Sequence, residues 1–189
     1  MILPIVAYGD PVLREVAVDI TKDYEGFDAF LQNMWDTMYE ADGVGLAAPQ
    51  VGKAIRLFVV DASTFADEAP SLADFKKVFI NAEIIEEFDE EWAFNEGCLS
   101  IPGVREDVTR LSKIRIKYVD EHFKAHEEEF DGMAARIIQH EYDHIEGVLF
   151  TDHLGALRKR MVKKKLEDIS KGNVKVAYKM KFPLLRRIK

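Results

Sequence analysis

The chain has 189 residues, 48% of them hydrophobic and 32% charged, and its formal net charge is −8 at pH 7. This size and composition are typical of one folded domain with a substantial core and exclude a largely disordered chain. The acidic balance argues against specific nucleic-acid readout, which needs a basic footprint. No apolar run approaches the roughly 20 residues that cross a bilayer, so we expect no membrane association.

The N-terminal part of the chain predicts one helix. The first residues, Met1 to Val6, lack the basic leader and the cleavage site of a secretory signal, so we expect a cytoplasmic protein. Residues 25–42 carry apolar side chains at helical spacing, and Asp42-Gly43 ends the run. The apolar positions of this helix are Phe27, Phe30, Leu31, Met34, Trp35, Met38 and Tyr39.

The middle of the chain predicts a turn followed by strands. The segment 43–50 lacks the glycine pattern of a phosphate-binding loop and, taken alone, indicates a turn between helix and strand. To a functional site, this segment could contribute closely packed backbone and one side-chain amide, that of Gln50. Residues 54–62 are rich in Ile, Leu, Phe and Val and predict a strand, and residues 63–76, with Pro70, predict a surface loop. Strand patterns return at 77–88, 104–110, 113–119 and 125–130.

Two helices follow these strands. Asp131 can cap a helix from Gly132 to about Glu146, with Gly147 as its stop. A last amphipathic helix runs from about Leu154 to Ser170. Strands in series, with helices segregated at a few positions, indicate an α+β fold with largely antiparallel sheets rather than alternating βαβ units. We expect a single domain over residues 1–189.

The C-terminal part is compositionally distinct. From residue 158 to 189 it holds 13 lysines and arginines against two acids, Glu167 and Asp168. The simplest interpretation is that these basic residues form the solvated face of the last helix. The alternative is that this basic helix and tail, about 154–189, bind RNA or an acidic surface, such as that of the ribosome. The last helix is predicted to bury Leu154, Leu157, Met161, Leu166 and Ile169.

The strongest chemical signal is the H-E-x-x-H pattern of His140, Glu141 and His144 on the predicted helix 132–146. One helical turn places His140 and His144 on the same face, with Cβ atoms roughly 5–6 Å apart, so both imidazoles can reach one metal ion. Glu141 lies next to the first ligand, where its carboxylate can reach water at the metal without coordinating it. The pattern favours a metal site over a structural pair of histidines.

Two histidines do not complete such a site, because a catalytic zinc-like ion usually takes three protein ligands. His122 and His126 lie among charged residues in a hairpin-like stretch, and His153 closely follows the motif helix. Cys98 is the better candidate: it lies between small or flexible positions, and a thiolate is a soft, strongly bound ligand. As a single cysteine it cannot form an internal disulfide, and the alternative is an ordinary buried thiol.

These three segments resemble the signature motifs of the peptide deformylases. The family's Gly-x-Gly-x-Ala-Ala-x-Gln loop matches residues 43–50, its Glu-Gly-Cys-x-Ser strand segment matches 96–100, and its Gln-His-Glu-x-Asp-His helix matches 139–144. The motifs occur in the family's order, and residues 9–14 and 143–150 also fit. The resemblance covers about residues 1–155 and implies sheets packed around a central helix that bears the H-E-x-x-H motif.

The resemblance implies a metal-dependent hydrolase that removes the N-formyl group from the N-terminal formylmethionine of nascent polypeptides and releases formate. Its substrates would be N-formylmethionyl peptides, and Glu141 would be the general base. Attack of water on the formyl carbon would create a negatively charged oxygen, the oxyanion. The metal, the Gln50 amide and the backbone N–H of Leu99 would stabilise its charge. The metal would be one divalent ion, usually Fe²⁺ in this family, with Zn²⁺, Ni²⁺ or Co²⁺ able to replace it. Its implied ligands are Cys98, His140 and His144.

The substrate-binding positions rest on the same resemblance. The backbone of Gly45 and Gly97 can hydrogen-bond an extended peptide, and Val44 and Ile137 can wall a pocket for the methionine side chain. The alternative for Val44 and Ile137 is ordinary core packing. Arg105, seven residues after Cys98, matches a position that contacts substrate in the family. The alternative interpretation is that Arg105 is an ordinary solvated side chain. We also expect an ion pair between the side chains of Asp42 and Arg110.

Two other functions fit part of this pattern. A zinc metallopeptidase uses the same helix motif but usually draws its third ligand from His or Glu beyond that helix, whereas Cys98 lies upstream. A non-catalytic, ribosome-associated metal module would not need Glu141 and Gln50. An assay with formylated and unblocked peptides separates these alternatives.

Overall fold

Five antiparallel strands form the main sheet of the protein, which is described by a computed structural model for residues 1–184. They follow one another across the sheet in chain order: β2 (Gly45–Ala47), β3 (Leu57–Asp61), β4 (Lys76–Cys98), β5 (Ile101–Val119) and β6 (Ala125–Asp131). A separate parallel pair, β1 (Ile5–Val6) and β7 (Met180–Lys181), joins the two ends of the chain. The last residues of the predicted basic tail, 185–189, lie outside the described residues.

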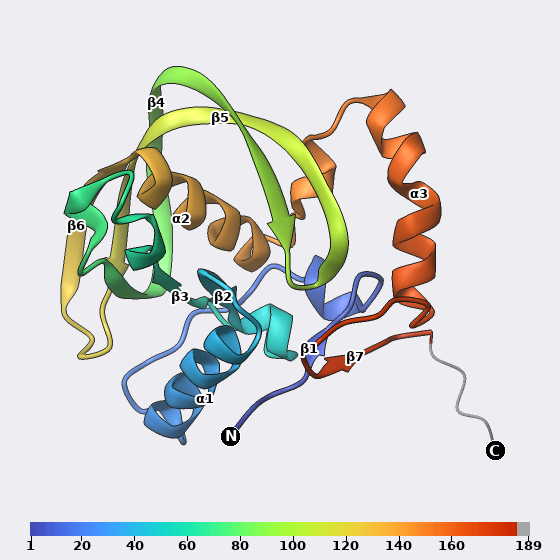
Figure 1. Cartoon of the computed structure of the whole chain (residues 1–189). Helices are drawn as coiled ribbons and strands as arrows, with labels where there is room; N and C mark the ends of the chain where they lie inside the picture. The colour runs from blue at the N-terminus through green and yellow to red at the C-terminus, as the bar shows by residue number, and fades with distance from the viewer. Residues whose placement is uncertain (185–189) are drawn as a thin grey trace.

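Three α-helices lie where the sequence predicts them: α1 (Phe27–Glu40), α2 (Gly132–Ile145) and α3 (Ala156–Ser170). Figure 1 shows α2 beneath the arch of β4 and β5, and it contacts β2, β3, β5 and β6. The α+β fold with antiparallel strands around a central motif helix is therefore confirmed. Asp131 stands at the N-cap of α2, but its side chain makes no capping hydrogen bond. Gly147, with φ of 72°, follows the end of the helix, as predicted.

The strand boundaries predicted between residues 77 and 119 are wrong. The segments 77–88, 104–110 and 113–119 are parts of two long strands, β4 and β5, which pair from Ile80↔Val119 to Cys98↔Ile101. The acid-rich stretch after Phe88 conceals the strand pattern because most of its side chains are exposed and few of its residues are apolar. Register shifts along the pair accompany its curvature, since bulges bend a strand. The bend carries Cys98 back toward α2 (Figure 1).

The segment between α1 and β4 also differs from its prediction. Residues 43–50 contain the short strand β2 and the start of a 3₁₀ turn (Ala48–Val51), where the sequence predicts a simple turn. The strand predicted over 54–62 is shorter, Leu57–Asp61. The loop predicted over 63–76 includes two 3₁₀ turns, Ser63–Phe65 and Pro70–Leu72, and its last residue begins β4.

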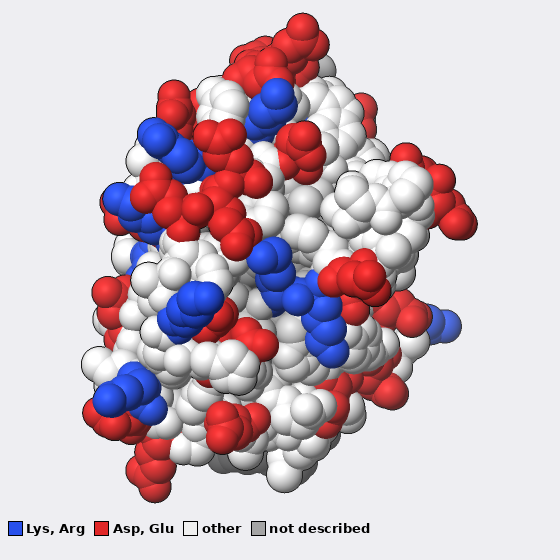
Figure 2. All heavy atoms as spheres, turned by 90° about the vertical axis from the view of Figure 1, so that its left-hand side faces the viewer, with Lys and Arg blue, Asp and Glu red and all other residues white. Residues whose placement is uncertain are grey.

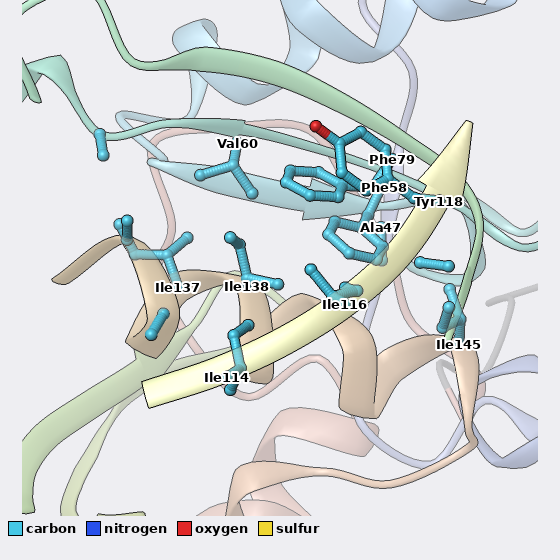
Figure 3. Packing of buried hydrophobic residues seen from close by; sticks show 14 of the residues in the cluster. Ala47, Phe58, Val60, Phe79, Ile114, Ile116, Tyr118, Ile137, Ile138 and Ile145 are labelled. Carbon is cyan, nitrogen blue, oxygen red and sulfur yellow. The ribbon is translucent and has the colours of Figure 1, made fainter. Parts of the chain in front are cut away.

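The core between the sheet and α2 explains why the motif helix is held firmly. Figure 3 shows Ile137, Ile138 and Ile145 of α2 facing Ile114 and Ile116 of β5 and the side chains of β3. The rings of Phe58 and Phe79 stack with centroids 4.8 Å apart. Because residues three and four apart share a helix face, the apolar positions of α2 fix its rotation and with it the direction in which His140 and His144 point.

The apolar face predicted for α3 is partly wrong. Leu154, Leu166 and Ile169 are buried as expected, together with Val162. Leu157 and Met161, however, are 72% and 59% exposed. The helix packs through a narrow stripe, so these two apolar side chains lie among the basic residues of its outer surface.

Acidic side chains gather on the face that carries β6 and the outer parts of β4 and β5, with basic ones among them (Figure 2). Some of these charges form exposed ion pairs, such as Lys113 with Asp89 at 2.9 Å and Arg115 with Glu86 at 3.1 Å. Each such pair contributes only about 0–1 kcal/mol to stability. Within residues 1–184, no helix combines the length and the apolar composition needed to cross a membrane.

Candidate metal centre and active site

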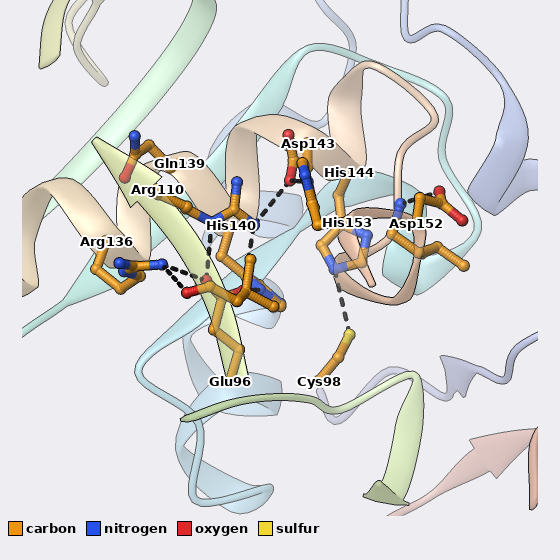
Figure 4. A network of polar contacts seen from close by, with 12 residues as sticks. Glu96, Cys98, Arg110, Arg136, Gln139, His140, Asp143, His144, Asp152 and His153 are labelled. Atoms are coloured by element: carbon orange, nitrogen blue, oxygen red, sulfur yellow. Dashed lines mark hydrogen bonds and ion pairs between the residues drawn. The ribbon is translucent and has the colours of Figure 1, made fainter. Parts of the chain in front are cut away.

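Three side chains, one from the end of β4 and two from α2, converge on one side of α2. His140 and His144 stand one helical turn apart with ring centroids separated by 5.2 Å, and Cys98 approaches them from the end of β4. The Cys98 Sγ lies 3.2 Å from His144 Nε2, and one ligand atom from each of the three residues lies within 4.8 Å of the others. Figure 4 shows the sulfur pointing toward the histidines. A soft thiolate and two imidazoles in this arrangement fit a transition-metal ion.

Glu96 fixes the orientation of His140. Its Oε2 lies 2.9 Å from His140 Nδ1, while its Oε1 accepts hydrogen bonds from Arg110 at 2.8 Å and Arg136 at 3.0 Å. Glu96 and both arginines are buried (Figure 4). A carboxylate on one ring nitrogen holds the imidazole so that the other nitrogen can bind a metal. Together with the donor set, this contact shows that the residues fit a divalent metal ion.

Arg110 does not pair with Asp42 as expected. Its carboxylate partners in the described part of the chain are Glu96 and Asp143, the latter at 2.9 Å, and Asp42 is exposed. A buried guanidinium needs compensating charge, and the motif helix supplies one of its two partners. Asp143 also pairs with His153, whose Nε2 lies 2.8 Å from Asp143 Oδ2, so that histidine is engaged outside the ligand set.

Charges at the centre shift the pKa values of Cys98 and Glu141. Desolvation opposes ionisation of the Cys98 thiol, but the charge of His144 and the hydrogen bond from His140 outweigh it and lower the pKa to about 5. Burial raises the pKa of the Glu141 carboxyl to about 7, against the effect of the two histidine charges. Glu141 Oε2 is buried and has no hydrogen-bond partner among the described residues. This carboxylate therefore has an open acceptor beside the ligand group.

Gln50 is held by its own loop. Its Oε1 accepts a hydrogen bond from the backbone N–H of Ala47 at 2.8 Å, which turns the amide nitrogen toward the end of β4. That nitrogen lies 3.4 Å from both Cys98 Sγ and Ser100 Oγ. Because one end of the amide is fixed by the backbone, its N–H groups are oriented at the sulfur before any ligand binds.

One cavity of about 590 Å³ opens beside these groups. With the exception of His144, which is 1% exposed, every site residue predicted from the sequence lines it. Met133 and Phe65 add apolar side chains to its wall. The lining residues among the predicted set are Val44, Gly45, Gln50, Gly97, Cys98, Leu99, Arg105, Ile137, His140 and Glu141.

Gly45 has no room for a side chain. A Cβ at this position would stand 2.4 Å from Glu141 Oε1 and 2.8 Å from Glu141 Cγ. We therefore expect Gly45→Ala to displace the carboxylate and to lower kcat by about 10²-fold, the effect of a misplacement near 1 Å. Steady-state assays with a formylated peptide measure the loss. Gly155→Ala is the matched control, because no atom lies within 4 Å of its added Cβ. Equal activity of the two variants would contradict this packing argument.

Arg105 packs across Gly97 at the edge of the cavity. A Cβ on Gly97 would stand 2.8 Å from Arg105 Nη1. The guanidinium donates to the side-chain oxygen of Asn95 at 3.0 Å and to its backbone oxygen at 2.6 Å. The exposed arginine thus has a fixed direction without a carboxylate partner among the described residues.

Sequence reasoning missed the roles of Glu96, Arg136 and Tyr178. Glu96 belongs to the recognised Glu-Gly-Cys segment, so its proximity to the centre could have been inferred. Arg136 is one helical turn before His140 and faces the same side. Tyr178 lines the cavity from a part of the chain with no chemical motif, and no sequence signal identifies it.

Comparisons with known proteins agree with this geometry. The model of the family described as polypeptide deformylase matches residues 2–160. A peptide deformylase of Christiangramia forsetii is 60% identical, over 97% of both chains, and one of Flavobacterium johnsoniae is 55% identical, over 99% of both chains. The crystal structure of a peptide deformylase from Legionella pneumophila aligns with a TM-score of 0.79 at 36% identity. It covers 92% of this chain and 98% of that one.

Proposed function

This chain belongs to the peptide deformylase family, and on that premise we propose that Cys98, His140 and His144 hold its metal and that Glu141 moves the proton. The enzyme is a metal-dependent hydrolase that removes the N-formyl group from nascent peptides and releases formate. Membership of this family favours that reaction over the metallopeptidase alternative. The observation that carries the ligand assignment is the convergence of one sulfur and two imidazoles within 4.8 Å, beside a buried carboxylate.

The metal is proposed to be Fe²⁺, with Zn²⁺, Ni²⁺ or Co²⁺ able to occupy the same ligands. A divalent ion held there supplies Lewis-acid chemistry, which polarises the formyl carbonyl and makes water a stronger nucleophile near pH 7. Glu96 supports the assignment because it holds His140 from behind at 2.9 Å. Such outer carboxylates commonly fix the ring of a metal-binding histidine.

Glu141 is proposed as the general base and then the general acid. Its carboxylate accepts a proton from the water that attacks the formyl carbon and returns that proton to the leaving amine nitrogen. Its Oε2 is buried without a hydrogen-bond partner in the described part of the chain, which suits an acceptor whose donor arrives with the reaction. Formate and a peptide with a free N-terminal methionine are the products.

The developing oxyanion is proposed to accept hydrogen bonds from Gln50 and Leu99. The fixed amide of Gln50 already points at the end of β4, and the backbone N–H of Leu99 belongs to the turn that directly follows β4. Donors that are oriented before the reaction stabilise a transition-state charge without a reorganisation cost.

The peptide is proposed to lie along the cavity between β2 and the end of β4. Gly45 and Gly97 offer backbone groups to an extended chain, and Val44 and Ile137 line the apolar space for the methionine side chain. Arg105 is available for a substrate oxygen because its only partner given by the structure is Asn95. Since initiating peptides emerge from cytoplasmic ribosomes, we propose the cytoplasm as the site of action.

One preparation tests both the metal and the reaction. The protein is purified without oxygen, its bound metals are measured by elemental analysis, and the same sample is assayed with formyl-Met-Ala-Ser and with the unblocked peptide. We expect bound iron, oxygen-sensitive activity and formate from the formylated peptide alone. Cleavage of the unblocked peptide, or absence of formate, would overturn the proposal.

The exposed surface of α3 is proposed to contact the ribosome. Lys163, Lys164 and Lys165 are all exposed, and Leu157 and Met161 add apolar area to the same surface. Basic residues bind an RNA surface in a salt-dependent way. We expect replacement of the three lysines by glutamine to weaken co-sedimentation with ribosomes at low salt while peptide turnover stays unchanged. A triple glutamine variant of Lys22, Lys53 and Lys124, which are exposed elsewhere, is the control; equal binding of the two variants would remove the idea.

A further inference from the structure

The chain returns to the active-site cavity after α3. β7 lies parallel to β1, with Ile5↔Met180 in register, and the backbone N–H groups of Ile5 and Ala7 donate to Lys179 and Lys181 at 2.9 Å. Figure 1 shows this last strand beside the first. The returning segment, residues 173–181, is therefore fixed to the core at its end. It lies beyond residue 160, where the match to the family model stops.

Tyr178 attaches this segment to the catalytic turn. Its hydroxyl donates a hydrogen bond to the backbone oxygen of Leu99 at 2.7 Å. Its side chain and that of Leu99 both pack against the core cluster around α1. Lys175, Val176 and Tyr178 thereby line the same cavity as Cys98 and His140. The returning segment is a wall of the site and not only a connection between α3 and β7.

Some charged side chains on the cavity lining have ion-pair partners and others have none among the described residues. Arg136 and Glu96 pair with each other at 3.0 Å in the buried network. Lys175 and Arg105 are exposed, and neither has an ion-pair partner within residues 1–184; Arg105 is hydrogen-bonded to Asn95. Asp42 is the one exposed carboxylate on the lining within the described part of the chain. Two cations are thus available to a ligand that passes over the rim.

We propose that the returning segment forms a subsite for the peptide residues that follow the formylmethionine, and that Lys175 makes this subsite favour acidic side chains. The inference rests on the proposed function of the cavity. With the formyl group at Cys98 and His140 and the methionine in the apolar part, the following residues would lie toward the exposed part of the lining, which includes Lys175. Tyr178 acts as a positioning residue, because it holds the wall against Leu99.

The test compares formyl-Met-Ala-Xaa peptides with Glu, Gln or Lys at the third position, at low ionic strength. A partly exposed charge pair changes kcat/KM by about two- to fivefold, so the wild-type enzyme should prefer Glu over Lys by about tenfold. Lys175→Glu should remove most of that preference, because Arg105 remains as the other cation on the lining. Lys179→Glu makes the same charge change at an exposed position outside the cavity lining and should keep the wild-type order. Salt should reduce each preference by screening.

Tyr178→Phe tests the wall itself, because it removes only the hydroxyl. We expect KM for the Glu peptide to rise several-fold while kcat changes less, since the hydrogen bond to Leu99 holds the wall that binds the distal residues. Equal Glu-to-Lys ratios in the wild-type and Lys175→Glu enzymes would overturn the subsite, with deformylation itself intact. Absence of formate from all three peptides would instead overturn the proposed function, and this subsite with it.

Discussion

Replacement of Glu141 by glutamine is expected to lower kcat by about 10²–10⁴-fold and to leave the metal content unchanged. The amide has the shape of the carboxylate but cannot accept a proton from water. Glu141 is 4% exposed and its Oε2 makes no hydrogen bond to the described residues, so the change breaks no structural contact of that atom. The measurement is formate release under saturating peptide, with metal analysis of the same sample.

The folded state should tolerate this replacement. Burial raises the pKa of the Glu141 carboxyl, which means that its charged form is poorly solvated, and a neutral amide avoids that cost. Glu146→Gln is the matched control just after the same helix, because Glu146 pairs with Arg56 at 2.7 Å outside the cavity lining. Turnover of Glu141→Gln within threefold of Glu146→Gln would rule out a general-base role.

Replacement of Cys98 by alanine is expected to abolish metal retention and, with it, activity. The thiolate is one of three protein ligands in the proposed centre, and it reaches His144 Nε2 at 3.2 Å. Loss of an outer-shell partner already costs about 10–100-fold in metal affinity, so loss of a direct ligand should exceed that range. Elemental analysis after desalting, and titration of the variant with Co²⁺ followed by its absorption spectrum, measure the effect.

His153→Ala is the control for this experiment. His153 is close to the motif in sequence, but its Nε2 contacts Asp143 at 2.8 Å, so its removal should leave the metal content near that of the wild type. Circular dichroism checks that both variants keep their secondary structure. Metal retained by Cys98→Ala, or lost equally by His153→Ala, would show that the ligand set is wrong.

The sequence predicts best where chemistry is local. The candidate ligand pair His140 and His144 follows from the H-E-x-x-H pattern on a helix, because side chains four residues apart share one face and Glu141 stands between them. The ends of α1, α2 and α3 agree with their predictions to within about two residues, since caps and glycines act over one turn. The family motifs are local patterns too, and they lead to the fold class and to the reaction.

Local spacing does not predict how partners that are distant in the chain meet. Cys98 and His144 are 46 residues apart; the resemblance named Cys98 as a candidate ligand, but only the curvature of the β4–β5 ribbon brings its sulfur to the helix. The burial of Arg110 between Glu96 and Asp143, in place of the expected pair with Asp42, likewise depends on which elements pack together.

The sequence by itself therefore determined the motif helix and the candidate pair of histidine ligands, because these depend on spacing within one helix. The third candidate ligand, Cys98, and the reaction came from the resemblance to the family motifs. Only the tertiary structure decided which side of α3 is buried, what holds His140 in place, and that Tyr178 and Lys175 reach the cavity. The physical reason is that such contacts join segments far apart in the chain. Their geometry is set by the packing of the whole core and not by the local backbone period.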